Sequence, residues 1–87
     1  EVKNDLFMTG FPNPVLDFYT VQFSLKKRCL LQFILQTSDG LVIDRWQNTF
    51  QAGNHQFVTD LSKMTPALYY LKVEGEDSSS YLKIIKE

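Results

Sequence analysis

The sequence predicts an all-β domain, an antiparallel immunoglobulin-like β-sandwich of seven strands with Greek-key connections. Turn-forming residues recur at short intervals, and the runs between them alternate between apolar and polar positions. Such alternation is typical of strands that bury one face. The runs are also rich in Val, Ile, Phe, Tyr and Thr, which favour pleated surfaces. Runs this short leave no room for long helices.

The chain of 87 residues is long enough for one domain. Residues 1–5 are interpreted as the end of a linker from an upstream part of the protein, and residues 6–87 as the domain. Because the chain does not begin with Met, we expect it to start inside a longer gene product. The seven expected strands are Leu6–Phe11, Phe18–Leu25, Cys29–Thr37, Leu41–Gln47, His55–Asp60, Leu68–Glu74 and Tyr81–Lys86.

Alternation also assigns side chains to shared faces within the longer runs. The shared faces are Tyr19, Val21, Phe23 and Leu25; Cys29, Leu31, Phe33 and Leu35; Tyr69, Leu71 and Val73; and Leu82 with Ile84. The single cysteine, Cys29, excludes an internal disulfide and is interpreted as a small buried hydrophobe. The domain must therefore be held together by packing or by attachment to a neighbour.

The connections between the runs carry turn signals. Residues 38–40, Ser-Asp-Gly, predict a hairpin because an Asp-Gly pair tolerates positive φ, and Gly53 plays a similar part before the fifth run. Asp39 and Asp60 are expected to form side-chain to backbone hydrogen bonds at their turns. Residues 60–64 are the one candidate for a helix, of a single turn at most.

Three further segments are interpreted from their composition. Pro12 and Pro14 lack amide hydrogens and should mark the end of an edge strand. The basic residues 26–28 are interpreted as a solvated hairpin tip, since nucleic-acid binding needs a broader basic face with stacking aromatics. Residues 75–80 are interpreted as a flexible polar loop.

No constellation for catalysis is present in the sequence. His55 is the only histidine and is interpreted as a strand residue at the solvent edge, and one His with one Cys cannot supply a zinc site. The acids are scattered over turns, so we expect no enzyme activity, metal or cofactor. The net charge of −1 attracts no nucleic acid, and no apolar run reaches the roughly 20 residues that span a bilayer.

The end of the chain, residues 81–87, is expected to be an edge strand with Lys83 and Lys86 around Ile84 and Ile85. Its lysines discourage aggregation in one interpretation. In the other, the exposed edge is an address label that a partner reads by strand addition. An exposed last strand is also a candidate for pairing with a second copy, which would give an edge-strand homodimer in isolation.

Five pieces of the chain, in order, resemble a known family. They are Phe11 with Pro12-Asn13-Pro14 and Asp17; Asp39-Gly40-Leu41-Val42; Gly53-Asn54-His55 leading to Asp60-Leu61-Ser62; Pro66-Ala67-Leu68-Tyr69 running into an alternating strand; and Lys83-Ile84-Ile85-Lys86. At this spacing, the chain resembles the type A C-terminal sorting domains of cargo proteins of the type IX (Por) secretion system of Gram-negative bacteria. The resemblance covers residues 6–86.

The resemblance implies a signal that carries an N-terminal passenger from the periplasm across the outer membrane, to the cell surface or the medium. It implies two partners, an outer-membrane barrel shuttle and a sortase that removes the domain. The residues expected to carry recognition are Lys83, Ile84, Ile85, Lys86, Tyr69, Leu71 and Val73. The residues expected to shape the turns are Pro12, Asn13, Pro14, Asp17, Gly40, Gly53, Asp60 and Ala67.

One residue departs from the family pattern, since Ala67 stands where the family has glycine. At a positive φ, alanine would cost on the order of 1 kcal/mol, so either this turn differs or it is strained. Two other functions stay open. A carbohydrate- or protein-binding module of fibronectin-like type would present an exposed aromatic row, Trp46 with Tyr70 or Tyr81, although core or edge packing of Trp46 is favoured. A structural spacer would be equally at home in the middle of a chain.

Overall fold

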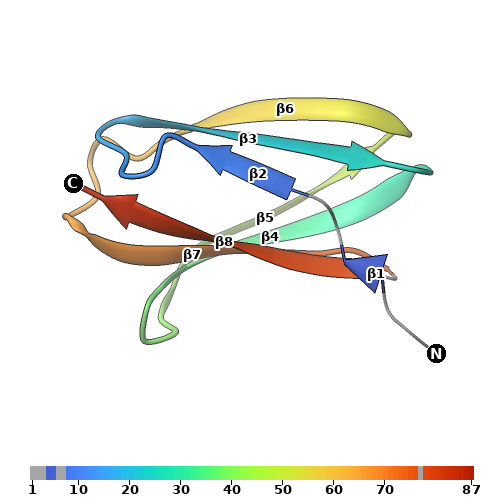
Figure 1. Cartoon of the computed structure of the whole chain (residues 1–87). Coiled ribbons are helices and arrows are strands. Elements are labelled where there is room, and N and C mark those ends of the chain that lie inside the picture. The colour runs from blue at the N-terminus through green and yellow to red at the C-terminus, as the bar shows by residue number, and fades with distance from the viewer. Residues whose placement is uncertain (1–3, 6–7, 77) are drawn as a thin grey trace.

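The computed structural model describes residues 4–5, 8–76 and 78–87 and has two sheets packed face to face (Figure 1). One sheet has the order β1-β8-β7-β4-β5 and the other the order β2-β3-β6. The strands are β1 (Asn4–Asp5), β2 (Met8–Phe11), β3 (Phe18–Leu25), β4 (Cys29–Thr37), β5 (Val42–Phe50), β6 (Gly53–Asp60), β7 (Ala67–Glu74) and β8 (Ser78–Lys86). Strands β2 to β8 pair antiparallel, and short β1 lies parallel to β8.

The predicted all-β sandwich is confirmed, and its strand order is consistent with the expected immunoglobulin-like Greek key. Strands β3 and β4 begin and end at the residues that the alternation predicted. Strand β5 runs three residues beyond Gln47 to Phe50, whose ring packs edge-on against Phe23 at 5.0 Å. Of the first expected strand, Leu6 and Phe7 lie outside the described residues.

Two expectations at the ends of the domain differ from the structure. Residues 78–80, expected in a flexible loop, belong to β8 because Ser79 and Ser80 pair with Glu74 and Val73 of β7. Three serines are tolerated there because ladder hydrogen bonds come from the backbone, whatever the side chain. At the other end, Asn4–Asp5 form β1 within the stretch expected to end a linker. The domain boundary at residue 6 stays a prediction.

The core lies between the sheets and follows the predicted alternation. The buried hydrophobic residues are Met8, Val15, Tyr19, Val21, Phe23, Leu25, Leu31, Phe33, Leu35, Leu61, Tyr69, Leu71, Val73 and Ile84. Cys29, expected to be buried, is only partly buried and packs against this cluster. At roughly 25 cal/mol per Å² of apolar surface removed from water, this burial is the main stabilising contribution to the sandwich.

Within the three-stranded sheet, the Tyr19 side chain of β3 lies close against Gly10 in β2. A Cβ atom at this position would lie 2.1 Å from the hydroxyl oxygen of Tyr19 and 2.5 Å from its ring carbon Cζ. The Tyr19 side chain is buried on β3, so it has no room to withdraw. Burial also raises the pKa of the Tyr19 phenol, because it disfavours the charged form.

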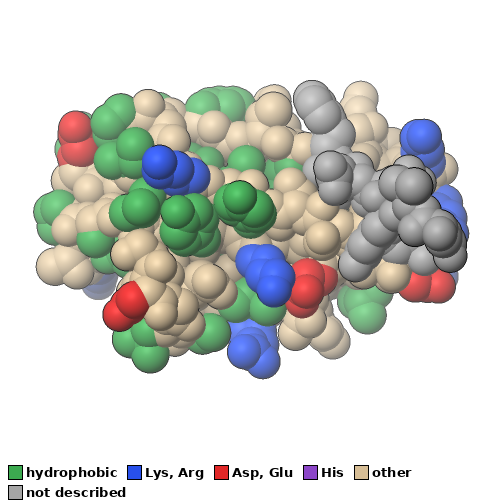
Figure 2. Space-filling view, turned by 60° about the horizontal axis from the view of Figure 1, so that its bottom comes forward, with side chains coloured by type: hydrophobic (Ala, Val, Ile, Leu, Met, Phe, Trp, Pro, Cys, Tyr) green, Lys and Arg blue, Asp and Glu red, His purple; other side chains and the backbone are tan. Residues whose placement is uncertain are grey.

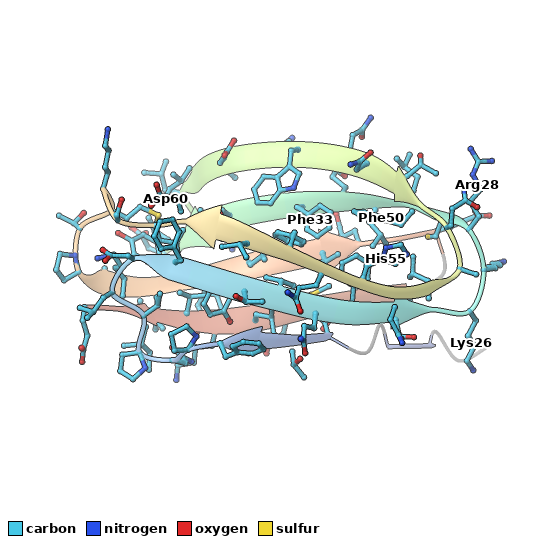
Figure 3. All side chains as sticks on the ribbon, turned by 90° about the horizontal axis from the view of Figure 1, so that it is seen from above. Lys26, Arg28, Phe33, Phe50, His55 and Asp60 are labelled. Atoms are coloured by element: carbon cyan, nitrogen blue, oxygen red, sulfur yellow. The ribbon has the colours of Figure 1, made fainter. Side chains whose placement is uncertain are left out.

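The connections confirm one predicted hairpin and contradict another. Residues 38–40 join the paired strands β4 and β5, with Gly40 at φ 94°. The basic residues Lys26 to Arg28, expected at a hairpin tip, instead cross from one sheet to the other, because β3 pairs with β2 and β6 while β4 pairs with β5 and β7. Lys26 and Arg28 point away from the sandwich at this end (Figure 3). The sequence pattern is the same for a hairpin and for such a crossing, and only the packing of both strands' apolar faces decides between them.

Residues 60–64, the candidate for a helical turn, form a turn after β6 and no helix. Leu61 is buried, its amide donates to the Asp17 carbonyl at 2.7 Å, and the Met64 amide donates to the Leu61 carbonyl at 3.0 Å. As predicted, Asp60 forms a side-chain to backbone bond, with the Ser62 amide donating to Oδ1 at 2.9 Å. Asp39 differs from expectation, since its carboxylate accepts from the Thr37 hydroxyl and not from a backbone amide.

We predict that acid removes a stabilising contribution of Asp60. Hydrogen bonds from the Ser62 side chain and then its backbone hold the pKa of Asp60 below its ordinary value of 3.8. A lowered carboxyl pKa stabilises the fold above pH 3.8, and this contribution is lost as the pH falls through the lower, folded-state pKa. Urea unfolding of the wild type and of Asp60→Asn between pH 2 and pH 6 would measure it. The difference between the two proteins should shrink below about pH 4, and a constant difference would refute the assignment.

Candidate functional site

The terminal strand β8 has neighbours along both of its edges. On one side it pairs antiparallel with β7, from Glu74↔Ser79 to Ala67↔Lys86. On the other side, Ser78 and Ser79 pair with β1, and Val15 forms a parallel bridge with Lys86. The segment after β2 therefore returns to lie beside the end of the chain, where β2 also contacts β8 (Figure 1).

Residues 13–15, which we call the edge cover, bind the outer backbone of β8. The Asn13 side chain accepts a hydrogen bond from the Ile85 amide at 2.8 Å and donates one to the Lys83 carbonyl at 3.0 Å. The Val15 amide donates to the Ile85 carbonyl at 2.8 Å, and the Val15 carbonyl accepts from the Glu87 amide at 2.9 Å. One carboxamide side chain, with its donor and its acceptor, thus replaces a peptide group of a neighbouring strand.

Local sequence explains how the edge cover reaches this position. Pro12 and Pro14 cannot continue the ladder with β3, so β2 ends at Phe11 as predicted, and the peptide bonds before both prolines are cis. Val15 follows with a side chain that is 0% exposed and anchors the segment in the core. The polar Asn13 and the apolar Val15 therefore bind the strand end and the core respectively.

The expectation of an exposed backbone edge at the end of the chain is wrong for residues 83–87. The edge cover occupies the Lys83 carbonyl, both backbone groups of Ile85 and the Glu87 amide. Strand addition at these positions would require the edge cover to leave, together with the buried Val15. A sequence pattern cannot show this, because the covering residues lie 70 to 72 positions earlier in the chain.

The structure divides the seven residues expected to carry recognition into two groups. The side chains of Tyr69, Leu71, Val73, Ile84 and Lys86 are buried, Lys86 being only 7% exposed with its ammonium donating to the Glu87 carbonyl at 2.6 Å. The Tyr69 hydroxyl donates to the Thr65 carbonyl at 2.7 Å. Only Lys83 and Ile85 are exposed, Ile85 to 40%.

The exposed side of the terminal hairpin forms what we call the β7–β8 face. It consists of three cross-strand pairs, Leu68↔Ile85, Tyr70↔Lys83 and Lys72↔Tyr81. Apolar and basic side chains are interspersed on this side of the molecule (Figure 2). Sequence reasoning placed Tyr70, Lys72 and Tyr81 on strands, and it named Tyr70 and Tyr81 only for a carbohydrate-binding row and none of the three for sorting recognition. The alternation of the sequence could have identified them, since it places them on the face opposite the buried Tyr69, Leu71 and Ile84.

The residues expected to shape the turns take different places in the structure. Gly53 begins β6 with a φ of 122°, and the Asp17 carbonyl accepts a hydrogen bond from the Leu61 amide. Ala67 begins β7 and pairs with Lys86. No described non-glycine residue has positive φ, so Ala67 carries no such strain and the local turn differs from one that needs glycine.

An aromatic cluster fills the flank between β5 and β6. Trp46 stacks on Phe33 with ring centroids 5.3 Å apart and planes 9° apart, which confirms its expected packing at the core. His55 stacks on Phe23 at 5.3 Å and lies beside Phe50 (Figure 3), so it is half-buried and its ring Nε2 lies 2.6 Å from the Gln51 carbonyl oxygen. The imidazole is thus engaged by rings and backbone.

The aromatic row expected for a carbohydrate-binding module does not form. Trp46 is opposite Phe33 in the register and faces the core. Tyr70 and Tyr81 lie on the outer face of the same sheet, with their rings 5.8 Å apart at 70°. The three rings cannot line one binding surface, because successive side chains of a strand point to opposite faces.

Within the described part of the chain, no group of three or more His, Cys, Asp or Glu side chains is gathered closely enough to hold a metal ion. A helix of membrane-spanning length and apolarity is likewise not found among these residues.

A known protein family matches most of the chain. No curated protein matches the chain. A family model described as secretion system C-terminal sorting domain matches residues 9–87, from β2 to the last residue, and so includes the edge cover and the β7–β8 face. This family is not a family of enzymes. The chain belongs to the C-terminal sorting domains of the type IX (Por) secretion system, and it is the sorting signal of a cargo protein that is exported to the cell surface or secreted.

Proposed function

We propose that the outer-membrane barrel shuttle of the type IX system recognises this domain in its folded state, through the β7–β8 face. The passenger, attached to the N-terminal side, would pass from the periplasm across the outer membrane together with the domain. The surface sortase would then cut in the linker, which makes the domain a substrate and not an enzyme. The passenger is afterwards anchored or released.

The cover on the terminal strand is the observation that supports recognition of a folded face. With the outer backbone of residues 83–87 bound by Asn13 and Val15, side chains are what this part of the strand offers to a partner. The buried Tyr69, Leu71, Val73 and Ile84 then act by holding β7 and β8 in place. Lys83 and Ile85 would contact the shuttle directly.

The two ends of β8 support separate sites for the shuttle and the sortase. Strand β1, through which the chain enters, pairs with Ser78 and Ser79, whereas the exposed Lys83 and Ile85 lie toward the other end of the strand. Seven residues of strand separate Ser79 from Lys86, about 23 Å at 3.3 Å per residue. A sortase cutting upstream of β1 would therefore not compete with a shuttle bound near the chain end.

Export of the full-length cargo tests the proposal. We expect Lys83→Glu combined with Ile85→Ser to hold most of the cargo in the periplasm, because the two substitutions remove the side chains that would contact the shuttle. Both side chains are exposed, so their replacement leaves the core intact. Cell fractionation with an antibody to the passenger measures this. The matched control is Lys26→Glu, an exposed lysine at the sheet crossing.

Circular dichroism of the purified variants shows whether the fold survives. Normal surface export of the folded double variant would overturn the proposal, whereas periplasmic arrest of the folded variant would support it. The homodimer through the last strand stays a prediction. It would require displacement of the edge cover, and a light-scattering mass of about 10 kDa for the chain of 10.1 kDa would exclude it.

A further inference from the structure

Tyrosines and lysines alternate on the β7–β8 face in a two-by-two arrangement. Tyr81 is directly opposite Lys72, and Lys83 is directly opposite Tyr70. The tyrosine rings contact each other across the diagonal, at 5.8 Å and 70°. This contact stabilises the ring pair. Because Tyr81 is 68% exposed, most of its ring is still accessible to a partner.

The charge on the outside of the five-stranded sheet is opposite in sign to that of the whole chain. The register places Arg45, Lys72 and Lys83 on this outer face together with the acidic Glu74, and the acidic Asp39 lies beside them at the tip of the β4–β5 hairpin. The Glu74 carboxylate oxygen Oε2 lies 3.6 Å from the Lys72 ammonium Nζ. Among the described residues, neither Lys83 nor Arg45 has an ion-pair partner. A chain of net charge −1 thus carries a locally basic surface.

An open groove of about 720 Å³ adjoins this arrangement. Its floor includes Tyr70, Lys72 and Tyr81, and its wall is the tip of the β4–β5 hairpin, residues 38–40. The hairpin bends below the sheet (Figure 1), next to a β-bulge between Leu35 and Gln36. Ser38, Ser79, Ser80 and Gln36 also line the groove and offer hydrogen-bond donors beside two aromatic rings. The one carboxylate in the lining, Asp39 at the hairpin tip, accepts a hydrogen bond from the Thr37 hydroxyl.

We propose that this groove and the tyrosine–lysine arrangement bind an acidic, extended segment of the receiving protein. The inference rests on the proposed function, and it names the chemistry of the partner at the same face. Carboxylates of the segment would pair with Lys72 and Lys83, and its apolar groups would pack on Tyr81. Opposite charges of this kind steer association and fix register.

Carboxylate fits this surface better than phosphate or sulfate does. The central cations are lysines, which act as single point charges, whereas phosphate sites more often use the forked arginine side chain or a nest of backbone amides. Lys72 already has a carboxylate neighbour in Glu74, at 3.6 Å. With Arg45, Lys72 and Lys83 against Glu74 and Asp39, the face also lacks the charge density that a polyphosphate or polysulfate requires.

Titration of the isotope-labelled 87-residue chain with a poly-L-glutamate decamer tests the inference by NMR. We expect chemical-shift changes at Tyr70, Lys72, Tyr81 and Lys83 that weaken as NaCl is raised, and an affinity loss of roughly tenfold for Lys83→Glu. Lys26→Glu should bind as the wild type does. Equal or stronger shifts with inorganic phosphate or dextran sulfate, or none with poly-L-glutamate, would overturn it.

Export of the same Lys83→Glu variant separates this inference from the proposed function. Arrested export of the variant, together with no poly-L-glutamate binding by the wild type, would overturn the acidic partner and leave the folded β7–β8 face as the recognised surface. Normal export with intact wild-type binding would instead overturn the face as the sorting surface. If the wild type binds poly-L-glutamate and the variant loses both binding and export, the result supports the acidic partner and the β7–β8 face as the sorting surface.

Discussion

Replacing Gly10 with alanine is expected to lower the free energy of unfolding by about 3 kcal/mol. The added Cβ would lie 2.1 Å from the Tyr19 hydroxyl oxygen, a distance that side-chain atoms do not tolerate. The Tyr19 ring is packed among buried neighbours, so β2 or the ring must shift, and overpacking of this kind typically costs about 1–3 kcal/mol. Chemical denaturation monitored by Trp46 fluorescence measures the change.

A second substitution shows whether the clash is the cause. Tyr19→Leu shortens the side chain that meets residue 10 and should cost stability by itself, since it removes a large buried ring. In the double variant, Gly10→Ala should add little further loss, because its obstacle is gone. Additive losses would show that the cost of Gly10→Ala arises elsewhere than at Tyr19.

Replacing Asn13 with aspartate is expected to cost about 2 kcal/mol of stability. The carboxylate can still accept from the Ile85 amide, but it has lost the donor that binds the Lys83 carbonyl and places like partial charges 3.0 Å apart. A typical hydrogen bond contributes about 0.5–1.5 kcal/mol, and the repulsion adds to that loss. Thermal unfolding measures the global effect, with Asn54→Asp on exposed β6 as the matched control.

Hydrogen exchange gives the local test of the edge cover. Without the Asn13 carboxamide, the amide of Ile85 should exchange faster, and so should the amide of Glu87, which depends on the neighbouring Val15 carbonyl. The Ser80 amide, at a position of β8 beyond the edge cover, should change little. Uniform acceleration along β8 would show that Asn13 stabilises the domain as a whole and does not act as a cover for the strand end.

Side-chain caps recur on the edges of this sandwich. On the edge strand β5, the Arg45 amide donates to the Asp44 carboxylate at 2.8 Å and the Thr49 amide to the Asn48 side chain at 3.0 Å. These bonds satisfy amides that an edge strand would otherwise offer to another chain. Together with Asn13 on β8, they show that side chains engage part of the backbone of the five-stranded sheet.

Period-two alternation predicted most of the fold, because it is a local property of the pleat. It located Phe18–Leu25 and Cys29–Thr37 to the residue and separated Tyr69, Leu71 and Val73 from the opposite face. The same alternation contained the β7–β8 face, but the family motif drew attention to consecutive residues such as Ile84 and Ile85. Ile84 is buried and Ile85 is exposed, so the motif contains one residue that stabilises the fold and one that a partner can contact.

Strands, faces and family membership follow from residues near one another in the chain, and the amino-acid order was sufficient for them. The neighbours of the terminal strand did not follow from it, because Asn13 and Ile85 lie 72 positions apart and their contact depends on where Val15 finds a place in the core. The crossing at Lys26 to Arg28 was likewise settled by packing of whole strands. Contacts over such distances become favourable only when both apolar faces are buried together, which is a property of the assembled sandwich.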